Sequence, residues 1–181
     1  MGRPSPAEAP AAPSRVDLSD SFHYPGEVSV RLSLTVHSTS PEQTLAAGEN
    51  LGARLASEFP RGAVVLLVGP LGAGKTVLAG GIARGLGIDE RLVSPTYTII
   101  SEYRAGTKVL HHVDLYRIEG RDQMENLGLD DILAGTGYVL VEWGEKMESS
   151  LSTPEAGAHL RVTLSLAPDG GRDIVVEEVA A

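Results

Sequence analysis

Three short segments have apolar patterns that are typical of β-strands. In VSVRLSLTV (28–36) every second residue is apolar, which predicts a strand with one buried face. AVVLLVG (63–69) and GYVLVEW (137–143) are instead apolar at most positions. Because strands in a parallel sheet are covered on both faces, these two segments are predicted to be buried strands, the first of them central.

Two further segments have the spacing of amphipathic helices. In STSPEQTLAAGENLGARLASEF (38–59), Ser40 is a suitable N-cap, Pro41 suits the first helical position, and Gln43 completes a capping box. The second helix follows GPLGAGKT and is predicted to end at Gly87. Apolar residues four positions apart mark the buried faces, namely Leu51, Leu55 and Phe59 in the first helix and Leu78, Ile82 and Leu86 in the second.

The rest of the chain contains two predicted hairpins and one broken helix. TYTIISEY (96–103) and KVLHHVDLY (108–116) flank RAGT, and HLRVTLSL (159–166) and RDIVVEEV (172–179) flank APDGG. RDQMENLGLDDIL between them is helical in pattern but interrupted at Gly128. We therefore predict a single α/β domain over residues 27–181, with a mixed central sheet of about six or seven strands and flanking helices.

The first 26 residues contain five of the eleven prolines and have no apolar periodicity. Such a composition buries too little surface to offset the entropy of ordering, so residues 1–26 are predicted to be a disordered tail.

Composition narrows the functional class. The net charge of −9 argues against nucleic-acid binding by bulk electrostatics, although it permits action on RNA through a basic partner. The absence of cysteine excludes a disulfide framework, a thiolate zinc site and a catalytic thiol. No signal-peptide pattern and no long apolar run is present, so we expect a cytoplasmic protein without a membrane partner.

GPLGAGKT (69–76) matches the Walker A pattern, with a strand predicted before it and a helix after it. Its glycines allow backbone N–H groups to point at a phosphate, at the positive end of a helix dipole. Lys75 is expected to contact the β- and γ-phosphates, and the Thr76 hydroxyl to ligate Mg²⁺. The predicted cofactor-binding residues of the loop are Gly69, Leu71, Gly72, Ala73, Gly74, Lys75 and Thr76.

Phosphoryl transfer also requires a carboxylate at the metal and a group that orders water. Asp114 and Glu142 each stand at the end of a predicted strand, the position at which α/β sheets bind ligands. Both are predicted metal ligands or catalytic residues. Thr96, in SPTYT (94–98), is a candidate sensor of the γ-phosphate, while the adjacent His111 and His112 should face opposite sides of a strand as core or surface residues.

The nucleotide is predicted to be ATP, because the guanine-reading pattern Asn-Lys-x-Asp is absent from the sequence. Two alternatives to a Mg²⁺-dependent ATPase share the loop. One is a small-molecule kinase, although arginines are sparse and no acceptor site is evident. The other is a nucleotide-gated binding module with negligible turnover.

Five motifs, GPLGAGKT, SPTYTI, HHVDLYR, LGLDD and VLVEWGEK, occur in this order. Together, over about residues 38–166, they resemble the TsaE (YjeE) family, small bacterial ATPases required for threonylcarbamoyladenosine modification of tRNA. The proline-rich leader departs from the family pattern, since members usually begin near the first ordered element.

The resemblance implies a compact α/β fold, slow ATP hydrolysis that depends on partners, and assembly with the TsaB and TsaD proteins. In that system TsaD modifies the adenosine beside the anticodon, and ATP turnover resets the complex, so tRNA is expected to be reached only through it. By position, Lys75 and Thr76 match the residues that hold phosphate and Mg²⁺, and Glu142 the second metal ligand. Asp114 matches the Walker-B-like acid and Thr96 the switch threonine. Ser40 to Glu42 match the segment near the adenine.

Overall fold

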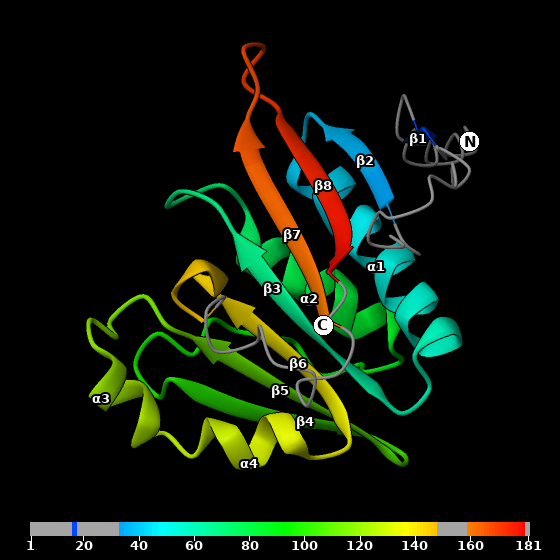
Figure 1. Ribbon diagram of the computed structural model, residues 1–181. Helices are drawn as coiled ribbons and strands as arrows, with labels where there is room; N and C mark the ends of the chain where they lie inside the picture. Colours follow the sequence, from blue (N-terminus) through cyan, green and yellow to red (C-terminus); the bar gives the residue numbers. More distant parts are fainter. Residues whose placement is uncertain (1–15, 18–32, 148–158, 180–181) are drawn as a thin grey trace, which may run out of the picture.

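The computed structural model describes residues 16–17, 33–147 and 159–179 of the chain (Figure 1). Its elements in chain order are β1 (Val16–Asp17), β2 (Ser33–Ser38), α1 (Pro41–Glu58), β3 (Gly62–Val68), α2 (Lys75–Gly85), β4 (Ile100–Ala105), β5 (Lys108–Asp114), α3 (Arg121–Glu125), α4 (Leu129–Ala134), β6 (Gly137–Glu142), the 3₁₀ helix η1 (Gly144–Lys146), β7 (His159–Leu166) and β8 (Arg172–Val179).

Within these residues one mixed sheet has the strand order β1-β2-β8-β7-β3-β6-β5-β4. The four central strands β7, β3, β6 and β5 are parallel, and the strands outside them pair antiparallel. Seven of the strands have six or more residues, which confirms the predicted mixed α/β sheet and its two hairpins. The parallel centre brings the carboxyl ends of β3, β5 and β6 to one edge.

Two predictions concern parts of the chain that are described only in part. Within the segment 1–26, Val16–Asp17 pair with β2, and the other residues lie outside the described part. The disordered tail therefore stays a prediction. The strand predicted over 28–36 corresponds to β2, which the structure describes from Ser33, so residues 28–32 also lie outside.

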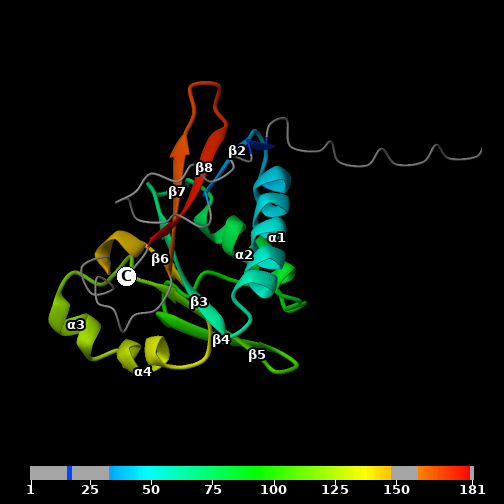
Figure 2. The ribbon, with the colours of Figure 1, turned by 45° about the vertical axis from the view of Figure 1, so that its right-hand side comes forward.

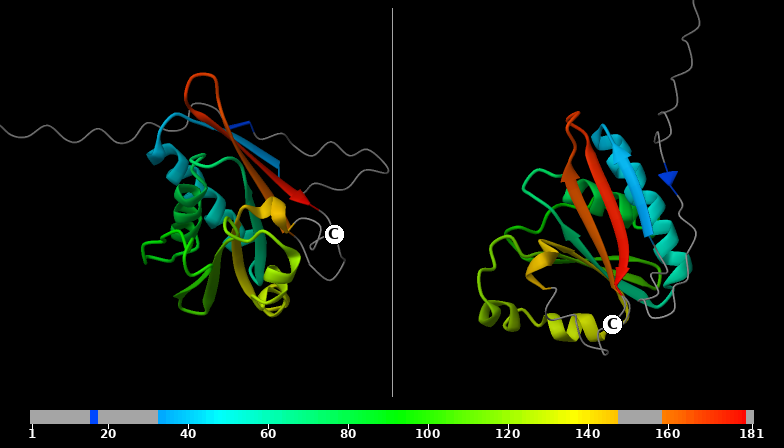
Figure 3. Two further views of the ribbon diagram at one scale, coloured as in Figure 1. Left: turned by 90° about the vertical axis from the view of Figure 1, so that its left-hand side faces the viewer. Right: turned by 45° about the horizontal axis from the view of Figure 1, so that its top comes forward.

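Helices cover the two faces of the sheet differently, as Figures 1 and 2 show. Helices α1 and α2 lie together on one face, where Leu51, Leu55 and Ile82 are fully buried against the sheet. The short helices α3 and α4 and η1 lie over the other face, beside residues such as Val64 and Val141. The β7–β8 hairpin extends beyond the helices at one end (Figure 3).

Local chemistry explains where α1 and α2 begin and end. The Ser40 hydroxyl accepts a hydrogen bond from the Gln43 backbone N–H, while the Gln43 side chain accepts from the backbone N–H of Thr39, a capping box displaced by one residue. Helix α2 ends at Gly85, and Gly87 (φ +87°) follows as the left-handed residue of a Schellman motif. The predicted end of this helix at Gly87 is thus confirmed within two residues.

The predicted strand 96–103 begins four residues later than expected, at Ile100. Two local features bend the chain before that point. The Ile99 N–H donates to the Pro95 carbonyl, which closes a turn, and Ile99 has φ +67°, which is incompatible with a strand. Among the described residues, no helix is both long and apolar enough to cross a bilayer.

Candidate functional site

The loop Gly69–Gly74 lies between the central strand β3 and helix α2, so it stands at the carboxyl edge of the sheet. Gly72 and Gly74 have φ of +78° and +100°, backbone conformations that favour glycine. A Cβ added to Gly72 would find no atom within 4 Å, so open space borders the loop at this residue. The N-terminus of α2, with its unpaired N–H groups, begins at the same point.

Lys75, the first residue of α2, is only 5% exposed. Its Nζ donates to the carbonyl oxygens of Gly69 at 2.6 Å and Pro70 at 2.9 Å, and it lies 4.1 Å from the centre of the Trp143 ring. Desolvation lowers the pKa of Lys75, an effect that Glu142 and other nearby carboxylates partly oppose. The ammonium group is thus held at the loop by neutral partners that a phosphate can replace.

Thr76 and Glu142 meet at the same edge, as their predicted role as metal ligands requires. The Thr76 hydroxyl donates to Glu142 Oε2 at 3.0 Å, and Glu142 ends β6 directly beside Leu67 of β3. His112 of β5 lies on the other side, with its Nε2 3.0 Å from Glu142 Oε1. Both oxygens of the Glu142 carboxylate are therefore hydrogen-bonded.

Asp114 is the strand neighbour of Glu142 and binds the segment predicted to be a switch. Its Oδ2 accepts hydrogen bonds from Thr96 Oγ1 at 2.7 Å and Ser94 Oγ at 2.8 Å, and its Oδ1 accepts from the backbone N–H of Tyr116. The acid and the threonine that the sequence singled out separately are thus in direct contact.

These groups open into one cavity of about 380 Å³. Oxygen ligands such as a threonine hydroxyl and carboxylates suit Mg²⁺, which commonly takes one or two carboxylates together with substrate phosphates. The described residues contain no cluster of three or more His, Cys, Asp or Glu that could hold a metal alone. The lining residues are Leu71, Gly72, Gly74, Lys75, Thr76, Val77, Ser94, Thr96, Asp114, Tyr116, Glu142 and Trp143.

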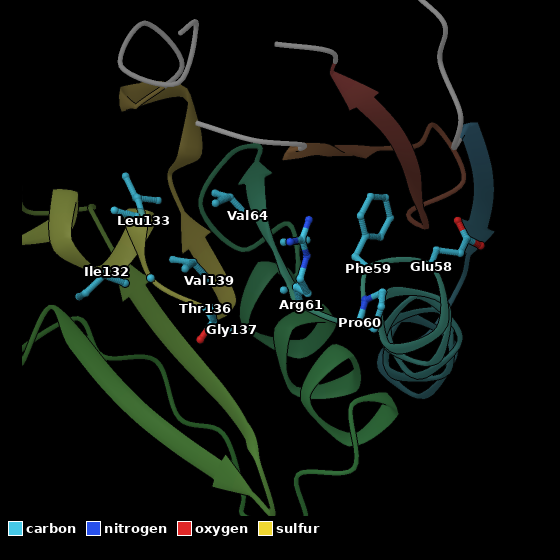
Figure 4. Close-up of a pocket in the computed structure, with 14 residues that line it drawn as sticks. Glu58, Phe59, Pro60, Arg61, Val64, Ile132, Leu133, Thr136, Gly137 and Val139 are labelled. Atoms are coloured by element: carbon cyan, nitrogen blue, oxygen red, sulfur yellow. The ribbon is translucent and has the colours of Figure 1, made fainter. Parts of the chain in front are cut away.

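A larger hollow of about 780 Å³ lies at the opposite ends of β3 and β6 (Figure 4). Phe59, Val64 and Leu133 contribute apolar surface to it. Of the described residues that line it, only Glu58 and Arg61 are ionisable. The smaller cavity carries the convergent titratable groups, and chemistry rather than volume identifies it as the functional site.

Two residues that the sequence analysis did not single out, Thr44 of α1 and Arg172 of β8, lie beside the phosphate loop at Gly74. The Arg172 side chain packs beside Gly74, and its Nη1 lies 3.4 Å from the hydroxyl of Thr44, which is fully buried. The buried Nε of Arg172 has no hydrogen-bond partner among the described residues. Ser40 caps α1 and Glu42 is exposed in its first turn; neither lines the cavity, and their proximity to adenine stays a prediction.

The predicted site residues Lys75, Thr76, Asp114 and Glu142 therefore converge, and Thr96 joins them. Sequence reasoning missed Ser94, His112 and Arg172. The motif SPTYT contained the signal for Ser94, because its hydroxyl is two residues from Thr96. For His112 the adjacent pair suggested only that one ring faces the core, and Arg172 starts a strand that is distant in sequence.

The fold and the loop define a P-loop nucleotide-binding protein. A family model described as "Threonylcarbamoyl adenosine biosynthesis protein TsaE" matches residues 38–174. The chain therefore belongs to the TsaE family, as the sequence motifs indicated.

Individual relatives agree with this assignment. The "tRNA threonylcarbamoyladenosine biosynthesis protein TsaE" of Bacillus subtilis is 41% identical over 141 residues, which cover 77% of this chain and 82% of that protein. The protein of the same name from Treponema pallidum is 39% identical and matched over 96% of its length. The crystal structure of YdiB from B. subtilis superposes with a TM-score of 0.65 at 34% identity, covering 85% of this chain and 90% of that one.

Proposed function

We propose that this protein is a Mg²⁺-dependent ATPase of low intrinsic turnover that acts with TsaB and TsaD in the threonylcarbamoyladenosine modification of tRNA. The observation that carries this proposal is the convergence of Lys75, Thr76, Glu142 and Asp114 around one cavity beside the phosphate loop. The names of the curated relatives supply the pathway. Such a role belongs in the cytoplasm, where tRNA is modified.

Each residue has a chemical task in this proposal. The loop N–H groups and Lys75 neutralise and hold the phosphate tail, and Lys75 leaves the carbonyls of Gly69 and Pro70 to do so. Thr76 and Glu142 hold Mg²⁺, which when bound screens the phosphate charge during transfer. Water-ordering falls to Asp114 and Thr96, which already share a hydrogen bond.

The region around the cavity mouth supports dependence on a partner. Leu71, Tyr97 and Val93 are large apolar or aromatic residues that are exposed, with Tyr97 88% exposed. Leu71 belongs to the phosphate loop, and Tyr97 follows Thr96 in the switch segment. Exposed apolar side chains at such a site are suited to protein–protein contact, so a bound partner would sense whether nucleotide is present.

The proposal is tested with the purified chain and a Glu142→Ala variant. Trp143 is the only tryptophan in the sequence and lies on Lys75, so its fluorescence should report nucleotide binding. ATP hydrolysis should depend on Mg²⁺, rise when TsaB and TsaD are added, and fall in Glu142→Ala far more than ATP binding does. Equal loss of binding and hydrolysis in that variant would instead indicate a folding role for Glu142.

Reconstitution with TsaB, TsaD, tRNA and ATP decides between this function and the alternatives. Modified adenosine should form only when the chain is present. Rapid hydrolysis by the isolated chain would contradict dependence on partners. Increased ADP release with candidate small-molecule acceptors would favour a kinase, and normal modification without any hydrolysis would favour a nucleotide-gated binding module.

A further inference from the structure

His112 is a fully buried polar residue, with 0% of its surface exposed, on the strand next to the edge strand β4. It lies on β5, and its side chain points to the same face as Asp114, two residues on. Its Nε2 lies 3.0 Å from Glu142 Oε1. Its other ring nitrogen, Nδ1, has no hydrogen-bond partner within the described ranges.

The hydrogen bond fixes the orientation of the Glu142 carboxylate. An ionised carboxylate only accepts, so His112 Nε2 must carry the hydrogen that is shared with Oε1. Oε2 accepts from the Thr76 hydroxyl. With one donor at each oxygen, from β5 and from α2, the carboxylate has a defined plane before any ligand binds.

A buried histidine at this position lowers the stability of the fold relative to an apolar residue. Its contact with Glu142 gives a reason for its presence. A buried ring nitrogen without a partner loses its hydration and gains nothing in return. An apolar side chain would fill the same space without that cost, as Leu110 does two residues earlier on the same face. Among the described residues the ring makes one hydrogen bond, and that bond goes to the proposed metal ligand.

We propose that His112 is a positioning residue, which holds the Glu142 carboxylate in the orientation that Mg²⁺ binding requires. This inference rests on the proposed function, in which Glu142 is a metal ligand. His112 itself touches neither nucleotide nor metal. Hydrogen-bond partners of metal ligands typically contribute about 10- to 100-fold in metal affinity, and we expect a loss in that range.

His111 provides the matched control, because it is the same residue type on the same strand and faces the other side of the sheet. Its Nδ1 lies 3.9 Å from Glu102 Oε2, and neither of these two residues lines the cavity. The test compares His112→Leu, His112→Gln, His112→Asn and His111→Leu. A glutamine amide can reach the position of Nε2, whereas the shorter asparagine cannot.

The measurement is ADP binding, followed by Trp143 fluorescence, in EDTA and over a Mg²⁺ titration, together with thermal melting. In His112→Leu the Mg²⁺ concentration at half-effect should rise about 10- to 100-fold, with ADP affinity in EDTA unchanged. His112→Gln should restore most of the loss, His112→Asn should not, and His111→Leu should behave as the wild type. If His112→Leu fails to fold, the Gln and Asn variants carry the comparison.

An unchanged Mg²⁺ dependence in folded His112→Leu or His112→Asn would overturn the inference, as would equal losses with and without Mg²⁺. Glu142→Ala separates this failure from failure of the proposed function. If Glu142→Ala leaves the Mg²⁺ dependence unchanged, the metal role of Glu142 itself is wrong. If Glu142→Ala is defective, adding His112→Leu should cause no further loss, because His112 acts through Glu142.

Discussion

Glycines in the α1–α2 contact and Gly72 in the phosphate loop have opposite physical roles. Where α1 crosses α2, a Cβ on Gly48 would stand 2.4 Å from the Leu78 carbonyl oxygen, and one on Gly81 would stand 2.2 Å from that of Leu45. In the phosphate loop, a Cβ on Gly72 would meet nothing within 4 Å. Gly48 and Gly81 therefore let the two helix backbones approach closely, whereas Gly72 borders open space.

The α1–α2 contact and the cavity beside the phosphate loop also differ in charge. The α1–α2 contact is close and mainly apolar, with an exposed Arg84–Glu49 ion pair beside it, which makes it a rigid support for the loop. The cavity beside the loop instead contains the buried charged groups of Lys75, Asp114 and Glu142, which are at most 5% exposed. Substitutions in the helix contact should therefore change the free energy of unfolding, and substitutions at the cavity should change ligand binding.

The largest expected effect is that of Lys75→Met on nucleotide binding. Removal of the ammonium group should weaken ATP binding by at least about 100-fold, because the phosphate charge loses its nearest cation. The melting temperature should be unchanged or higher, since the substitution removes a buried charge whose pKa burial lowers. Calorimetric titration and thermal melting measure the two effects, with Lys108→Met as the control, because Lys108 lies at the end of β5 opposite Asp114. A normal affinity would contradict the assignment of the loop.

Gly81→Ala should destabilise the fold by about 3 kcal/mol, because its Cβ would overlap the α1 backbone and force the helices apart. Gly80→Ala is the matched control in the same helix. There the nearest atom to an added Cβ is Leu45 Cδ1 at 3.9 Å, so alanine should stabilise the helix by up to about 1 kcal/mol. Urea denaturation should resolve the opposite signs. Equal changes in the two variants would refute the close contact as the reason for Gly81.

Gly72→Ala tests whether the backbone conformation, rather than a lack of room for a side chain, requires glycine at this position. With φ at +78°, an L-residue here should cost about 1 kcal/mol of stability, even though no atom obstructs the Cβ. Because the new methyl group borders the cavity, ADP affinity should also fall. Denaturation and fluorescence titration of the same sample compare both effects. A stability loss as large as that of Gly81→Ala would contradict the distinction between Gly72, which borders open space, and Gly81, which packs against a backbone.

The smallest effect is expected at the exposed end of the β7–β8 hairpin. When protonated, His37 donates from Nδ1 to Asp173 at 2.7 Å and from Nε2 to Asp169 at 2.9 Å, and these hydrogen bonds raise the pKa of His37 above its usual 6.5. A raised pKa means that this stabilisation is fully present below pH 6.5 and is lost as pH rises through the folded-state value. Melting curves from pH 6 to 9 should therefore converge for wild type and His37→Gln as pH rises; parallel curves would contradict the ion pairs.

Most of the fold could be predicted because its signals are local. The caps of α1, the unbroken apolar run of β3 and the turn residues of the hairpins each act within a few positions of the chain. The predicted start of strand 96–103 was wrong because a turn closed by the Ile99 N–H and the positive φ of Ile99 precede Ile100. In the same segment the Thr96 and Ser94 hydroxyls bind Asp114, which is distant in sequence. Local apolar pattern does not contain that information.

In the candidate site, too, local sequence predicts some features and only the tertiary structure decides the others. Sequence determined the loop with Lys75 and Thr76, because backbone angles and a helix start are encoded in consecutive residues, and it placed Asp114 and Glu142 at strand ends. Only the tertiary structure decided that these strands are neighbours, that His112 binds Glu142, and that Arg172 reaches Gly74. The physical reason is that sheet order and register, which are set by packing over the whole domain, determine which side chains from distant segments meet.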